Sequence, residues 1–113
     1  MKTKTLVRTL AAAALLALAF SAARAADAKE TWEKNCAKCH GSDGKGDTKM
    51  GKKVGVKDYT DAKVQAEMTD DRMFKSVKEG IKDGDKTKMK PAEGLSDDEI
   101  KAMVAYVRAF GKK

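Results

Sequence analysis

Two cysteines and a histidine stand close together in the sequence, in the order Cys36-x-x-Cys39-His40. Two cysteines three positions apart lie on one face of a helical turn, where each thiol can bond to a vinyl group of haem. A histidine directly after the second cysteine can place its imidazole on the iron. The spacing therefore predicts one c-type haem, covalently attached through Cys36 and Cys39, with His40 as an iron ligand.

Three other kinds of site are open to these residues. A disulfide between Cys36 and Cys39 would close a very short loop and would stabilise the fold little. A thioredoxin-like thiol pair needs a βαβ setting, and the sequence has no strand pattern to supply one. A structural zinc site needs four ligands, whereas the chain offers two cysteines and one histidine. The haem interpretation is favoured over all three.

The second axial position of the iron is open to a methionine, to an amine or to no ligand, because His40 is the only histidine. Three methionines stand at apolar positions of expected helices, where methionine usually fills the core: Met68, Met73 and Met103. Met50 follows His40 by only ten residues, which is a short reach around the haem ring. Met89 lies in a lysine-rich segment that gives it no packing role. We therefore predict His40 and Met89 as metal ligands, with Met50 as the weaker candidate.

Occupation of both axial positions decides between two classes of function. An iron with histidine and methionine ligands has no position for oxygen or peroxide, so it only exchanges electrons. The expected function is then a one-electron carrier and not an enzyme. An open or labile sixth position would instead suit a peroxidase or a gas sensor, although the chain has no second histidine for distal acid–base work.

The first part of the chain has the layout of a secretory signal peptide. A basic start precedes an apolar run over residues 10–20, and Ala23-Arg24-Ala25 offers a cleavage site. The run is too short to span a bilayer, so a permanent anchor is the less favoured alternative. We expect residues 1–25 to be a signal peptide for export to the periplasm and residues 26–113 to be the mature domain; cleavage as late as Ala28 would also fit.

Helical periodicity dominates the mature chain, and no segment alternates as a strand does. The apolar spacing predicts helices over residues 27–37, 61–68, 69–80 and 96–111. Thr69 is the expected N-cap of the third helix, and Ser96 with Glu99 forms a capping box for the fourth. Residues 41–58 and 82–94 are expected to be polar loops. The sequence thus predicts an all-α domain, whose few large apolar residues a haem would supplement as the core.

The mature chain resembles the class I cytochromes c of the small bacterial type. The resemblance rests on the motif at Cys36–His40, on the Met-Lys-Pro segment at Met89, and on C-terminal residues 95–100 and 105–108. These motifs occur in the right order and span nearly the whole mature chain. The resemblance implies three to five helices wrapped around the covalent haem, held in a cleft, with His40 and Met89 as its axial ligands.

Further expectations come from the same resemblance. It implies that the N- and C-terminal helices cross and that Trp32 on the first meets Tyr106 on the second. The family often has glycine at the crossing where this chain has Ala28, and many members have a proline in the loop after the haem motif, which this chain lacks there. The carbonyl that accepts from His40, expected near residues 54–56, is therefore left open.

Charge points to the kind of partner. Removal of residues 1–25 takes four basic residues away and lowers the formal net charge from +7 to +3. Nucleic-acid binding has little support from so small a charge on an exported chain. Lysines in the two expected loops could steer docking to acidic surfaces of redox proteins: Lys45, Lys49, Lys52, Lys53, Lys82, Lys86, Lys88 and Lys90. We expect a monomer with redox proteins as partners and no membrane span after cleavage.

Overall fold

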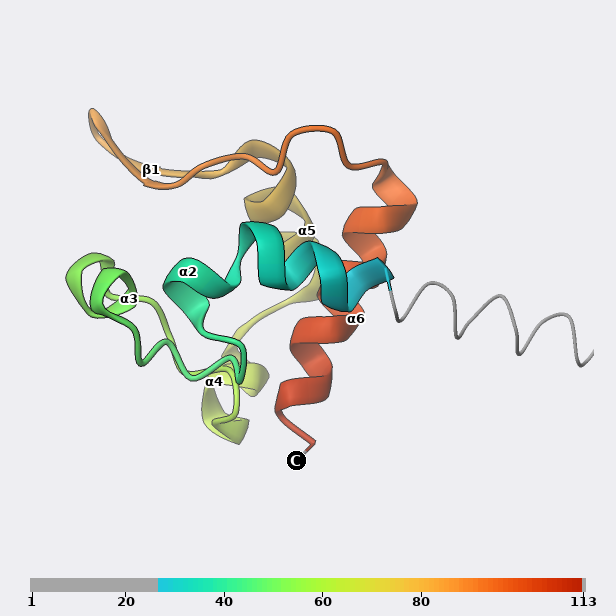
Figure 1. The fold of residues 1–113 in the computed structure, drawn as a ribbon, viewed down its shortest axis with the longest axis horizontal. Helices are drawn as coiled ribbons and strands as arrows, with labels where there is room; N and C mark the ends of the chain where they lie inside the picture. The colour runs from blue at the N-terminus through green and yellow to red at the C-terminus, as the bar shows by residue number, and fades with distance from the viewer. Residues whose placement is uncertain (1–26, 113) are drawn as a thin grey trace, which may run out of the picture.

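The computed structural model describes residues 27–112, which form a small, mostly helical domain (Figure 1). Helical residues 27–35 lead to α2 (Ala37–His40), α3 (Lys49–Val54), α4 (Ala62–Glu67), α5 (Asp70–Glu79), β1 (Ile81–Asp83), β2 (Lys86–Met89) and α6 (Asp97–Phe110). The predicted all-α class is confirmed, with one small hairpin added. The expected signal peptide lies outside the described residues. Within them, no helix is long and apolar enough to cross a membrane.

The core lies where the first helix crosses α6 (Figure 1). Trp32 is only 2% exposed, and its ring lies 5.6 Å from that of Tyr106 and 5.2 Å from that of Phe110. The contact between Trp32 and Tyr106 that the resemblance implied is therefore present. Ala28 belongs to the same buried cluster, so the crossing accommodates its methyl group.

Helix α6 forms as its sequence predicts. The Ser96 hydroxyl accepts from the Glu99 amide at 3.2 Å, and the Glu99 carboxylate accepts from the Ser96 amide at 3.2 Å, which completes the capping box. The helix buries one apolar face against the core, made of Ile100, Met103, Val104, Val107 and Phe110. The burial of this face fixes the helix against residues 27–35.

The two middle helices also match their predictions. The Asp61 carboxylate caps α4 by accepting from the Lys63 amide at 2.8 Å. The Thr69 hydroxyl caps α5 by accepting from the Arg72 amide at 3.2 Å, and Gly80 ends that helix. These caps satisfy backbone amides that a helix start leaves without intrahelical partners.

The loop predicted over residues 41–58 is wrong in its middle, where α3 forms. The Thr48 hydroxyl accepts from the Gly51 amide at 2.8 Å and so begins this helix, and Gly55 ends it in the left-handed region at φ 80°. Gly51 is buried so closely that a Cβ there would collide with the Cys39 carbonyl oxygen. The helix is only six residues long, and the glycines within and around it lower the helix propensity of this stretch, so the sequence did not indicate it.

The polar loop predicted over residues 82–94 is likewise corrected, because β1 and β2 form a two-stranded antiparallel hairpin. Lys82 pairs with Thr87 and Asp83 with Lys86, and Gly84 at the turn has a φ of 60°. Apart from half-buried Met89, both strands are exposed on their two faces, so no apolar alternation marks them in the sequence. Their three and four residues are too few for the pattern to show.

Candidate haem-binding site

Helix α2 and its N-cap residue Cys36 bring the three residues of the predicted attachment motif together in a single turn. The backbone amides of Cys39 and His40 both donate to the Cys36 carbonyl, at 3.2 and 3.0 Å. Both cysteines are free thiols and half-buried. Burial first, and then the neighbouring Cys39, raises the pKa of Cys36 to about 11, so its thiol is protonated at neutral pH. The turn thus offers two unbonded thiols next to a histidine, as attachment to two vinyl groups requires.

Aromatic rings surround the His40 imidazole. His40 is 9% exposed, and the Trp32 ring lies 5.4 Å from its ring centroid. The Tyr59 ring stacks on it at 5.2 Å with 21° between the planes. Burial lowers the pKa of His40, which favours the neutral imidazole. Neutral imidazole is the form that binds a metal ion.

One atom of this ring tests the fit of a haem directly. His40 Nδ1 is fully buried and has no hydrogen-bond partner among the described residues. A histidine that binds a metal ion uses one ring nitrogen and leaves the other off the metal, so an unpartnered Nδ1 is compatible with binding through Nε2. A neutral, buried histidine beside two free thiols fits the donor set of a c-type haem. The residues present therefore fit the group.

Hydrogen bonds from three segments hold the backbone of the motif. The Thr48 hydroxyl donates to the Cys39 carbonyl at 2.7 Å, and the Gly46 amide donates to the His40 carbonyl at 2.7 Å. The Trp32 indole donates to the carbonyl of the next residue, Gly41, at 2.9 Å. The first helix, the glycine-rich loop and the start of α3 thus jointly fix the end of α2.

The carbonyl expected to accept from His40 near residues 54–56 is not seen within residues 27–112. The Val56 amide donates to the Gly51 carbonyl at 3.0 Å, so this stretch closes the end of α3. Tyr59, three residues beyond this stretch, does contact His40, and no motif in the sequence predicted this contact. A single aromatic side chain in a polar, glycine-rich stretch was the available signal.

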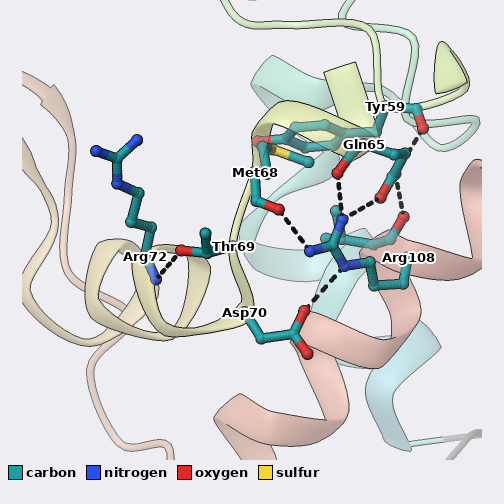
Figure 2. Close-up of polar contacts among 8 residues, drawn as sticks. Tyr59, Gln65, Met68, Thr69, Asp70, Arg72 and Arg108 are labelled. Carbon is teal, nitrogen blue, oxygen red and sulfur yellow. Dashed lines mark hydrogen bonds and ion pairs between the residues drawn. The ribbon is translucent and has the colours of Figure 1, made fainter. Parts of the chain in front are cut away.

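Tyr59 is itself held firmly in place. Its amide donates to the Gly44 carbonyl at 2.8 Å, and its carbonyl accepts from Gln65 Nε2 at 2.7 Å. Burial, and next the nearby Cys36, raises the pKa of its phenol. Figure 2 shows Gln65 between Tyr59 and the guanidinium of Arg108. Hydrogen bonds to both the amide and the carbonyl of Tyr59 therefore hold its backbone in place.

Met89, the predicted axial ligand, lies on a separate element at the end of β2. It is half-buried, and Ile81 is its partner in the hairpin register. At Gly80, where φ is 77°, a Cβ would lie 2.5 Å from the Met89 carbonyl oxygen, so the end of α5 approaches the strand closely. The Ala92 amide donates to the Val77 carbonyl at 2.8 Å and ties the segment after Met89 to α5. Its role as a ligand stays a prediction.

Three other methionines have the packing roles that the sequence predicts. Met103 is buried in the core, and Met68 and Met73 pack against it. Met50 lies on α3 and is 38% exposed. Within residues 27–112, no group of three or more histidine, cysteine or acidic side chains could hold a metal ion.

Comparisons with known proteins point to one family. The family model described as "Cytochrome C oxidase, cbb3-type, subunit III" matches residues 23–107. The c-type cytochrome KustC0563 is similar in structure, with 34% identity and a TM-score of 0.64, over 73% of this chain and 94% of that chain. A tyrosine-to-phenylalanine mutant of the same cytochrome gives 34% identity and a TM-score of 0.65, over 74% of this chain and 98% of that one. No curated protein matches. The chain belongs to the c-type cytochromes, and its domain is that of a haem-based electron carrier.

Proposed function

We propose that this chain is a periplasmic one-electron carrier with a single haem attached through Cys36 and Cys39. His40 and Met89 are its axial ligands, and the chain makes and breaks no bonds of a substrate. When bound, the haem supplies an iron that accepts and returns one electron. Export is inferred from the signal-like residues 1–25. Redox proteins outside the cytoplasm are its partners.

The observation that carries this proposal is the turn of α2. It presents two free thiols and a buried imidazole within five residues, and the hydrogen bonds to the Cys39, His40 and Gly41 carbonyls hold that turn in place. A rigid attachment turn favours electron exchange, because little has to move when the charge of the iron changes. Trp32 and Tyr59 pack against the imidazole, and His40 is only 9% exposed.

Met89 is the methionine whose position best suits a ligand. It is half-buried yet outside the core cluster, whereas Met68, Met73 and Met103 are accounted for by packing. A thioether is a soft, neutral ligand that stabilises ferrous iron. We therefore expect a higher reduction potential than two histidine ligands would give.

Exposed lysines supply the proposed docking surface. Four lie in and before α3 and four lie in or beside the hairpin: Lys45, Lys49, Lys52, Lys53, Lys82, Lys86, Lys88 and Lys90. Asp47 lies 2.9 Å from Lys52 and Asp83 lies 3.5 Å from Lys88, so part of this charge is neutralised locally. The remaining cations would attract an acidic face on a partner at a rate that falls with salt.

The deciding experiment is a visible spectrum of the protein, oxidised and reduced, from a host competent in haem attachment. We expect a sharp reduced α band and the weak red band of methionine bound to ferric iron. Met89→Ala should remove the red band and lower the potential, while Met50→Ala, the matched control, should keep both. Cys36→Ala or Cys39→Ala should abolish stable holoprotein.

Other outcomes would redirect the proposal. A high-spin spectrum without the red band would favour an open iron and a peroxidase or gas sensor. No haem absorption at all would leave a thiol redox protein. Loss of the red band in Met50→Ala and its retention in Met89→Ala would move the axial ligand to α3.

The description of the matching family favours a second candidate, an electron-transferring subunit of an oxidase. A free carrier should run as a monomer in size-exclusion chromatography of periplasmic extracts. A subunit should instead remain with the membrane fraction in the native host and leave it only with detergent.

A further inference from the structure

We propose that Tyr59 is the positioning residue for His40, and that Gln65 and Arg108 hold Tyr59 against the imidazole. The proposal rests on the proposed function, because it treats His40 as an iron ligand. It assigns to one aromatic ring the orienting task that a hydrogen-bond acceptor usually performs for a ligating histidine.

The contacts of the His40 imidazole show what restricts the rotation of its ring. A ligating histidine normally donates its second ring nitrogen to a carbonyl or carboxylate, which fixes the rotation of the ring. No acceptor lies at His40 Nδ1 among the described residues. The nearly parallel Tyr59 ring, 5.2 Å away at 21°, is the contact that restricts this rotation instead. The tilted Trp32 ring, at 37°, supports the imidazole as well.

Hydrogen bonds from Gln65 attach Tyr59 to α6. Gln65 Nε2 donates to the Tyr59 carbonyl at 2.7 Å and to the Val107 carbonyl at 2.9 Å. One amide group thus joins the Tyr59 backbone to the backbone of α6, across 42 residues of sequence. A shift of this amide would move the tyrosine relative to α2.

Arg108 fixes the amide of Gln65. Arg108 Nη1 donates to Gln65 Oε1 at 3.1 Å and to the Gln65 carbonyl at 2.6 Å. Its Nη2 donates to the Met68 carbonyl at 2.7 Å, and its Nε donates to Asp70 Oδ1 at 2.9 Å (Figure 2). The planar guanidinium therefore has acceptors on both sides, and the Gln65 oxygen it binds leaves the amide nitrogen facing Tyr59.

The ring contact has a consequence for the redox chemistry. Tyr59 covers the imidazole, and removing its ring would admit water beside the ligand. Water stabilises the more highly charged ferric state, so the reduction potential would fall. Phenylalanine keeps the ring and loses only the hydroxyl, so it would keep the potential near that of the unmodified protein.

The test compares holoprotein variants in redox titrations. We expect Tyr59→Leu to retain the low-spin spectrum but to have a lower potential, and Tyr59→Phe to match the wild type. An unchanged potential in Tyr59→Leu would overturn the role of the ring. Proton NMR of the haem ligands gives a second readout in Gln65→Leu, which keeps both aromatic rings: the His40 ring signals should shift there and stay in place in Tyr59→Phe.

The role of the support needs its own variant and a matched control. Gln65→Leu is neutral and similar in size, but it loses the donor to Tyr59. Ser96→Ala also destabilises α6, by removing a cap at its other end. We expect a lower potential and shifted His40 signals in Gln65→Leu only. If the two variants have the same reduction potential and the same His40 signals, Gln65 contributes only to the stability of the fold and does not hold Tyr59 against the imidazole.

Failure of this proposal is distinguishable from failure of the proposed function. A wild-type protein without haem, or with an open iron, would refute the carrier function and this proposal together. A wild-type protein with the expected spectrum whose Tyr59→Leu variant titrates identically would refute only the positioning role.

Discussion

The substitution Arg108→Lys should lower the free energy of unfolding of the domain, because lysine cannot replace all the hydrogen bonds of the guanidinium. The guanidinium donates to the carbonyls of Gln65 and Met68 at 2.6 and 2.7 Å, and to the side chains of Gln65 and Asp70 at 3.1 and 2.9 Å. Its side chain is 29% exposed. Lysine keeps the charge, but its single ammonium cannot reach acceptors spread around a planar fork.

The magnitude follows from the bonds that lysine cannot replace. A hydrogen bond with a charged donor contributes about 1.5–3 kcal/mol, and partial exposure lets water satisfy some of the freed acceptors. Loss of two such bonds should therefore lower the free energy of unfolding by about 2 kcal/mol. For a domain of this size that corresponds to a fall in Tm on the order of 10 °C.

Thermal unfolding of the holoprotein, followed by circular dichroism, measures this cost. The control is Lys78→Ala, which breaks the exposed pair with Asp97 at 3.0 Å and should cost within about 1 kcal/mol. Arg108→Lys should also shift the reduction potential in the same direction as Gln65→Leu. A melting temperature for Arg108→Lys equal to that of Lys78→Ala would refute the reasoning.

Three further outcomes are expected. Ser96→Ala should lower the free energy of unfolding by about 1 kcal/mol in urea titrations, because α6 loses its cap; no change would contradict the capping box. Gly51→Ala should sharply reduce the yield of holoprotein, judged from haem absorbance per protein, because its Cβ would collide with the Cys39 carbonyl; a normal yield would show that α3 can move away from α2. Hydrogen bonds from the Thr60 hydroxyl and then its amide lower the pKa of Asp58. Its contribution to stability is therefore complete above the ordinary value of about 3.9 and is lost as the pH falls through the lower folded value. Asp58→Asn should accordingly lose less stability than the wild type between neutral pH and strong acid, and parallel losses would argue against this role.

Local signals in the sequence were sufficient for most of the helices. The Ser96 capping box, the Thr69 cap and the regular apolar face of α6 depend only on residues within a few positions of one another. The spacing of Cys36, Cys39 and His40 is equally local, since one turn of α2 brings all three together. Such features do not depend on distant parts of the chain, because their hydrogen bonds close within one or two helical turns.

Short elements without an apolar face were missed for the opposite reason. Helix α3 has six residues, and its stability comes from packing Gly51 against the Cys39 carbonyl and from the Thr48 bond to the same group. The hairpin has exposed strands, so no alternation distinguishes it from a polar loop. Tertiary contacts, and not intrinsic propensity, decide segments this short.

The residues that could attach a haem were identifiable from residue type and from spacing within a single turn, because covalent chemistry depends on these two things alone. The residues that surround His40 depend on the folded arrangement of distant segments. Tyr59 follows it by 19 residues and is held through Gln65 by Arg108, which lies 43 residues beyond Gln65. Contacts over such separations depend on how the helices cross, and that crossing is set by the joint burial of Trp32 and Phe110, not by any local pattern.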